Sequence, residues 1–118
     1  MKRLMLTVTM LATLSGCSNE GGEKVKAILE CSMASKLVGR VESIDAFADY
    51  TNIIVAKYKL KIKVSEVQAM HDEIKAEWNL KSMSRHDQDV LLVNVYNSSF
   101  CASIHLQRKI DVEDVPEG

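Results

Sequence analysis

Apolar residues recur at intervals of three and four positions along most of the chain, as they do on the buried face of an amphipathic helix. This spacing predicts a first helix over residues 23–40 and a second helix that follows Ser43 as its N-cap. The apolar stripe of the second helix comprises Ile44, Phe47, Ala48, Thr51, Ile54, Val55 and Tyr58. Asp45 near the start and Lys57 near the end of this helix complement its dipole.

Two further helices are expected in the second half of the chain. The third begins at Ser65, where the sequence SEVQ is typical of a capping box closed by Gln68. Its buried face would comprise Val67, Met70, Ile74 and Trp78. The fourth begins at Ser84 and runs to Lys109. Because residues 90–96 are apolar on nearly every side, this helix is expected to be central in the fold.

Two segments instead alternate apolar and polar residues, as a half-buried strand does. They are KYKLKIKV at 57–64 and SIHLQRKIDV at 103–112, and they leave an α+β fold as the alternative. Hairpin turns usually need glycine or proline, but after residue 22 the only glycines are Gly39 and Gly118, and the only proline is Pro116. We therefore predict an all-α fold, a small four-helix bundle.

The first sixteen residues follow a different pattern. Lys2 and Arg3 precede an apolar run, LMLTVTMLATLSG, whose length of about 13 residues is too short to span a bilayer stably. A basic start followed by a short apolar core is typical of a secretory signal peptide. Residues 1–16 are therefore predicted to direct export and to be removed.

Leu14-Ser15-Gly16-Cys17 resembles the lipobox of bacterial lipoproteins. This resemblance implies cleavage before Cys17 and attachment of diacylglycerol to its thiol, with more than one acyl chain for stable anchorage. Ser18 stands where aspartate would retain a lipoprotein at the inner membrane, which resembles the pattern of outer-membrane lipoproteins in enteric-type bacteria. The expected location is the outer membrane, facing the periplasm, with residues 17–23 as the lipidated cysteine and a flexible tether.

Composition restricts the class of partner. Two of the 15 basic residues lie in the signal peptide, which leaves 13 against 16 acidic residues and a mature net charge near −3. This balance argues against binding of nucleic acid or of an anionic membrane surface, so membrane contact is expected through the lipid anchor only. About a hundred mature residues suffice for one small domain. We predict a helical domain over residues 24–110 and a loose acidic tail over 111–118.

Cys31 and Cys101 remain once Cys17 is lipidated. In an exported protein such a pair is most simply a disulfide, and no CxxC spacing supports a redox or metal-binding role. The bridge would join the first and last helices. It would close a loop of about 70 residues, for which the chain-entropy model predicts a stabilisation of the folded state by about 4 kcal/mol.

Few residues have the spacing of a metal site. The consecutive residues 71–73 (HDE) point in three directions on a helix and cannot form one site. His86, Asp87 and Asp89 look more like a metal cluster, but a helix N-terminus favours aspartate for electrostatic reasons alone. We predict no bound metal and no cofactor.

The signals for catalysis are equally few. Ser98 and Ser99 near His105 are the only local candidates for a nucleophile beside a base, and no elbow glycines accompany them. His105 is expected to be a partly buried residue with a satisfied hydrogen bond. We predict that the protein is not an enzyme.

A protein partner remains the favoured class of ligand. Trp78 is the sole tryptophan; if exposed it would anchor an interface, and if buried it belongs to the core. Arg85 and His86, in the segment KSMSRHD at 81–87, are the other predicted partner-binding residues.

A small lipoprotein with a four-helix mature domain and a disulfide between its first and last helices is similar to two groups of proteins. Pilotins escort secretin subunits to the outer membrane by holding a helix in a groove. Helical immunity proteins block cell-wall amidases delivered by type VI secretion. The resemblance implies an accessory or pilot-like factor that binds an envelope protein, or alternatively an inhibitor that uses a protruding loop. Capture of a small ligand or metal, the third alternative, requires a cavity lined by His71 or His86.

Overall fold

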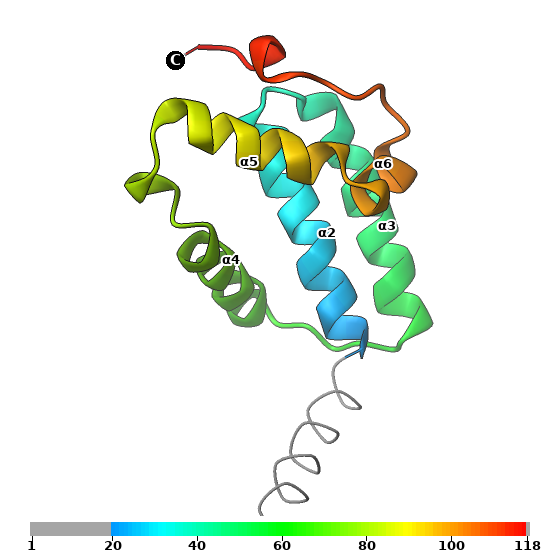
Figure 1. Ribbon diagram of the computed structural model, residues 1–118. Helices are drawn as coiled ribbons and strands as arrows, with labels where there is room; N and C mark the ends of the chain where they lie inside the picture. Colours follow the sequence, from blue (N-terminus) through cyan, green and yellow to red (C-terminus); the bar gives the residue numbers. More distant parts are fainter. Residues whose placement is uncertain (1–19, 118) are drawn as a thin grey trace, which may run out of the picture.

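The computed structural model describes residues 20–117, and every regular element in this range is helical (Figure 1). Its α-helices are α2 (Glu20–Leu37), α3 (Ile44–Lys57), α4 (Val64–Trp78), α5 (Arg85–Asn97) and α6 (Ser99–His105). Three 3₁₀ helices accompany them, namely η1 (Val41–Ser43), η2 (Leu80–Ser82) and η3 (Val112–Asp114). The predicted all-α fold is confirmed. Neither 57–64 nor 103–112 forms a strand, so the α+β alternative is wrong.

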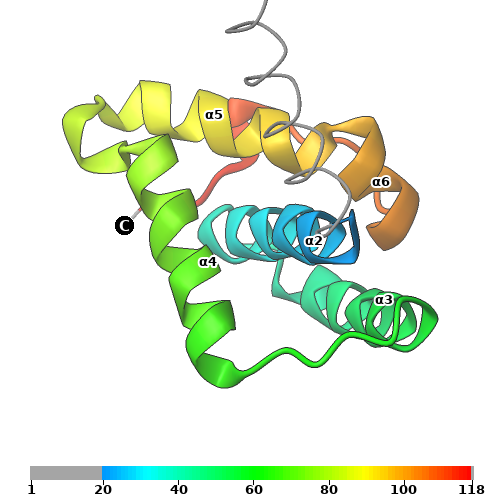
Figure 2. The same cartoon turned by 90° about the horizontal axis from the view of Figure 1, so that it is seen from below.

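Helix α2 runs through the middle of the fold, with α3, α4 and α5 packed around it (Figures 1 and 2). Seen along its axis in Figure 2, it has α4 on one side, α3 on another and α5 across a third. Its buried residues follow the predicted helical spacing; they are Gly21, Val25, Ile28, Cys31, Ala34 and Ser35. The central helix is therefore α2, and not the predicted fourth helix.

Two apolar clusters form the core, and α2 contributes to both. The first cluster is made by Ala34, Val38, Ile74, Trp78, Leu92, Val93, Tyr96, Ile110 and Val115. The second cluster is made by Val25, Ile28, Cys31, Phe47, Ile54 and Cys101. The buried apolar residues in the first half of α2 thus pack with those of α3 and α6, and Ala34 near its end packs with those of α4 and α5.

The predicted disulfide is present. Cys31 of α2 and Cys101 of α6 are bonded, with their Cα atoms 5.5 Å apart. Both residues are buried, at 1% and 2% exposure, inside the second cluster. The bridge joins the first and last α-helices of the described range, as the sequence predicted.

The prediction of one fourth helix over residues 84–109 is wrong, because two helices occupy this range. Helix α5 ends at Asn97, and the Ser98 hydroxyl then caps α6 by accepting a hydrogen bond from the Cys101 backbone N–H (3.3 Å). Serine and asparagine favour such positions because their side chains compete for backbone hydrogen bonds. Helix α6 ends at His105, so the chain beyond it is not α-helical.

The C-terminal segment packs on the domain. The Asn97 side chain donates to the backbone carbonyl of Ile110 (2.8 Å) and accepts from its N–H (3.0 Å). Ile110 and Val115 are each 7% exposed and belong to the first cluster. The loose tail predicted for residues 111–118 is therefore wrong for the described part, because apolar side chains fix it to the core. The folded domain extends beyond its predicted end at residue 110.

At its other end the folded domain begins earlier than predicted. Helix α2 starts at Glu20, so the flexible tether expected over residues 17–23 is wrong for its last four residues. The predicted signal peptide, residues 1–16, and the predicted lipidation site Cys17 lie outside the described range.

Two glycines permit close packing at the ends of α2. A Cβ added to Gly21 would come within 2.9 Å of the Tyr58 Cβ and 3.0 Å of a Leu60 methyl, so this residue lets the segment after α3 pack on α2. Gly39 follows the helix with φ at +78°, and an added Cβ there would lie 2.9 Å from Pro116. Gly39 therefore allows both a left-handed turn and contact with the C-terminal segment.

The predicted helix starts are partly correct. Ser84 caps α5, since its hydroxyl accepts from the Asp87 backbone N–H (3.1 Å). The start predicted at Ser65 is wrong: Lys63 is the N-cap residue of α4, and its N–H donates to the Glu66 carboxylate (3.4 Å). Glu66 is the N3 residue of this earlier start and occupies the role predicted for Gln68.

Ser43 precedes α3 but does not cap it with its side chain. Its buried hydroxyl forms a hydrogen bond with the Tyr96 hydroxyl (3.1 Å). His105 stacks on Tyr96 (ring centroids 4.2 Å apart) and meets Phe47 edge-on. Its Nδ1 accepts from the Gln107 N–H (2.8 Å), and its Nε2 donates to the Tyr96 carbonyl (3.0 Å). The expected hydrogen bonding of His105 is confirmed, and the ring is fully rather than partly buried.

Removal of the disulfide is predicted to lower the free energy of unfolding by about 4 kcal/mol in the Cys31→Ser/Cys101→Ser variant of the full chain. The reason is that the cysteines are 70 positions apart, so the bridge restricts most of the unfolded chain. Urea unfolding followed by circular dichroism measures the change. Reduced wild-type protein should match the variant, and a loss below about 1 kcal/mol would contradict the prediction.

Candidate functional site

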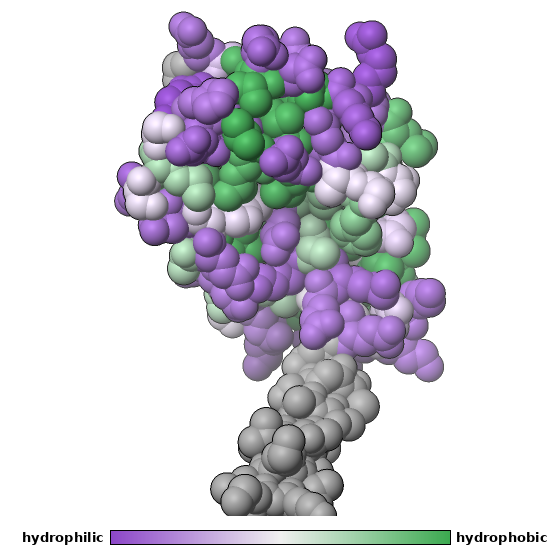
Figure 3. Space-filling view, viewed as in Figure 1, coloured by the Kyte–Doolittle hydropathy of each residue, from purple (hydrophilic) through white to green (hydrophobic). Residues whose placement is uncertain are grey.

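An apolar groove of about 810 Å³ runs between α2, α5 and the start of α6. We call it the α2–α5 groove. Its apolar lining comprises Ala27, Met83, Val90, Leu91, Val95 and Phe100, with the Cys31–Cys101 disulfide also on its wall. Figure 3 shows apolar surface over α5 with hydrophilic residues around it. The groove is thus an apolar surface that the domain does not cover with its own helices.

Two carboxylates line the same groove, Glu30 from α2 and Asp87 from the first turn of α5. Burial raises the pKa of Glu30 above its usual value; the Lys26 ammonium opposes this rise and the Glu77 carboxylate adds to it. The groove therefore combines an apolar floor with negative charge. Such a surface favours a ligand that is apolar on one face and basic at its edges.

Lys26 fixes α4 beside this groove. Its Nζ donates to the carboxylates of Glu73 (2.6 Å) and Glu77 (3.0 Å), both on α4. These two hydrogen bonds raise the pKa of Lys26. Because the carboxylates are about half exposed, the pairs orient α4 on α2 more than they stabilise the fold.

The charges of α4 separate on either side of its buried stripe. Ile74 and Trp78, one turn apart, face the core. Glu73 and Glu77 lie on the side that meets Lys26, whereas His71 and Lys75 lie on the opposite side. Helix α4 therefore presents an acidic flank towards one part of α2 and a basic flank towards another.

Of the residues predicted to bind a partner, Trp78 belongs to the core. It is 9% exposed and packs in the first apolar cluster, which is the second of the two alternatives that the sequence left open. It is therefore not an exposed interface anchor.

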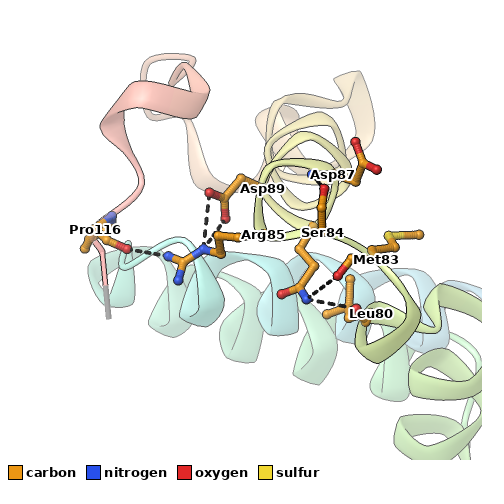
Figure 4. Close-up of polar contacts among 8 residues, drawn as sticks. Leu80, Met83, Ser84, Arg85, Asp87, Asp89 and Pro116 are labelled. Atoms are coloured by element: carbon orange, nitrogen blue, oxygen red, sulfur yellow. Dashed lines mark hydrogen bonds and ion pairs between the residues drawn. The ribbon is translucent and has the colours of Figure 1, made fainter.

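Arg85 and His86 lie in the first turn of α5 but differ in their surroundings. Figure 4 shows the Arg85 guanidinium between two acceptors: Nε donates to Asp89 (3.1 Å) and Nη2 donates to the Pro116 carbonyl (2.7 Å). Arg85 thus joins α5 to the C-terminal segment. His86 is exposed, and its predicted role in partner binding stays a prediction.

The connection from α4 to α5 is held by its own hydrogen bonds. Gln88 donates from its side-chain amide to the backbone carbonyls of Leu80 (2.9 Å) and Met83 (3.1 Å). Together with the Ser84 cap, these bonds fix the position of Met83 at the end of the α2–α5 groove.

The remaining candidates for chemistry do not assemble into one site. The Ser98 hydroxyl donates to the Val95 carbonyl (2.7 Å), and both ring nitrogens of His105 bond to backbone groups. Within residues 20–117 no three His, Cys, Asp or Glu side chains gather in a way that could hold a metal ion. The α2–α5 groove is therefore the candidate site.

Comparisons with known proteins add no family. The chain matches no protein-family model, no curated protein and no solved structure. Of the helices described, none is both long enough and apolar enough to cross a bilayer.

The groove residues were not among the predicted partner-binding residues. Val90 and Phe100 were not predicted to bind a partner, although the apolar character of residues 90–96 on nearly every side was visible in the sequence. A helix with more apolar positions than one core face needs leaves some of them for a second surface. That excess was the available signal.

Glu30→Gln is predicted to stabilise the folded protein near neutral pH, with a gain that shrinks as the pH falls. Because the folded-state pKa of Glu30 is raised, the folded protein binds this proton more tightly than the unfolded chain. Ionisation of Glu30 therefore costs stability above the folded-state pKa, and this cost disappears below the unfolded-state pKa. Urea unfolding of both proteins at pH about 7 and about 4 measures it. An equal gain at both pH values would contradict the prediction.

Proposed function

We propose that this protein is a membrane-anchored, periplasm-facing lipoprotein that binds another envelope protein by accepting one of its helices in the α2–α5 groove. The observation that carries the proposal is an apolar groove with carboxylates beside it on a fixed helical scaffold. Uncovered apolar surface of this kind is a common mark of a protein interaction site.

The groove suits an amphipathic helix as its occupant. Grooves between helices accept the apolar face of a partner helix, which anchors through residues spaced three and four apart. Phe100 is 36% exposed and stands at one end of the lining, and Met83 stands at the other end of α5. Glu30 and Asp87 would pair with lysine or arginine at the edges of the bound helix.

The lipobox resemblance supports a position close to a membrane. Cys17 precedes the first residue of α2, Glu20, by three positions. Ala27 lies seven residues into α2, a distance of about 10 Å along the helix axis. A partner bound in the groove would therefore be held close to the lipid anchor, as an accessory or pilot-like role requires.

Inhibition of a cell-wall enzyme is the second candidate function. The segment that would act as an inhibitory loop, residues 81–87, is exposed at most of its positions, including His86. Its backbone is already held by Gln88 and by the Ser84 cap, so it presents a fixed surface. Partner identity, together with the residues on which binding depends, separates the two roles.

Groove variants are predicted to lose the partner while an exposed control keeps it. Val90→Glu and Phe100→Glu add charge of the same sign as the groove carboxylates, whereas Ile53→Glu changes a 59% exposed apolar residue on α3. We expect partner recovery on detergent-solubilised full chain to fall at least about tenfold for the groove variants only. Mass spectrometry of captured proteins measures this, and circular dichroism verifies folding.

Equal recovery by all three variants would contradict groove binding. The inhibitor role would be supported if a cell-wall hydrolase is recovered, and if substitution of His86 abolishes its recovery while substitution of Val90 does not. Both roles would be contradicted if no captured protein is lost on substitution in the α2–α5 groove or at His86.

A further inference from the structure

A second pocket, of about 550 Å³, lies beside the basic flank of α4. We call it the α2–α4 pocket. Three elements enclose it: the last turns of α2, the second half of α4 and the start of η2. Its floor is apolar and includes Met33, Leu37, Trp78 and Leu80. It is more enclosed than the α2–α5 groove and smaller.

Three lysines also line the pocket. Lys36 comes from α2, Lys75 from α4 and Lys81 from η2, and all three are exposed. None of them forms an ion pair with any residue between 20 and 117, whereas Lys26 of α2 has two carboxylate partners on the acidic flank of α4. Like charges repel when they gather at one place, so the pocket would gain from an anion that neutralises them.

We propose that the α2–α4 pocket binds a fatty acid, with the alkyl chain on the apolar floor and the carboxylate among Lys36, Lys75 and Lys81. The volume is in the lower half of the range of about 300–1,000 Å³ for small-molecule pockets, which suits one alkyl chain rather than two. A carboxylate is small enough to interact with several ammonium groups at once. Unlike a larger lipid headgroup, it places no other polar atoms against the apolar floor. This inference does not depend on the proposed function.

The sole tryptophan of the chain lies in this pocket and reports on its occupancy. Trp78 is 9% exposed and part of the lining, so a bound alkyl chain changes its environment directly. Laurate is titrated into the full chain at pH about 8, where the carboxylate is ionised. We expect a saturable shift of the Trp78 emission.

Charge dependence is tested with a matched pair of variants. Lys36→Gln/Lys75→Gln/Lys81→Gln removes the three pocket charges and should weaken laurate binding about tenfold. Lys24→Gln/Lys61→Gln/Lys109→Gln removes three positive charges outside the pocket lining and should leave laurate affinity unchanged. Leu37→Asp, at a 50% exposed position of the floor, should also weaken binding without loss of the fold.

Other ligands test whether the pocket requires both an alkyl chain and a carboxylate. Dodecanol has the same chain without the charge and should bind at least about tenfold more weakly than laurate. Equal binding of laurate and dodecanol, or an unchanged affinity in the triple lysine variant, would overturn the proposal. Tighter binding of lysophosphatidylglycerol than of laurate, or an equal Trp78 shift with an acidic peptide that has no alkyl chain, would also overturn it.

Discussion

Burial of one face of α2 joins the two halves of the core, because Val25, Ile28 and Cys31 belong to the second apolar cluster and Ala34 belongs to the first. Small side chains such as Ala34 and Ser35, both fully buried, let the neighbouring elements approach the helix closely. The disulfide then fixes α6 to the same helix. Helices α3, α4 and α5 all pack on α2, so the packing of this helix determines the shape of both the groove and the pocket.

The position of α4 follows from this arrangement. It contributes only two residues to the core, Ile74 and Trp78, and packs mainly on α2. Because α4 packs on α2 through a narrow stripe, its two flanks have different surroundings: the acidic flank pairs with Lys26, and the basic flank lines the α2–α4 pocket. The carboxylates of the α2–α5 groove come from α2 and α5 instead, so the groove and the pocket differ in charge although α2 lines both.

The sequence predicted the features that depend on local spacing or on chemistry alone. Helix α3, the Ser84 cap and the disulfide are of this kind, because apolar period, capping and cysteine pairing can each be read from the chain. The break at Ser98 was not predicted, since the apolar pattern continues across it and only a side-chain cap marks it.

The packed C-terminal segment and the groove were also beyond prediction from sequence. Burial of Val115 and Ile110 depends on contacts with distant residues, including the bond from Asn97 to Ile110. The groove depends on how far α5 stands from α2, which no local pattern specifies. Val90 was visible as an apolar residue, but its exposure to a groove follows only from the tertiary arrangement.

The most direct measurement of the central claim is photo-crosslinking in living cells, with a photoreactive amino acid placed singly at position 90, 100 or 53 of the full chain. If a partner helix binds in the groove, positions 90 and 100 capture the same envelope protein through one of its helices, and position 53 on α3 does not. Capture from position 53 alone, or no capture from 90 and 100 while the folded chain is present, would contradict it.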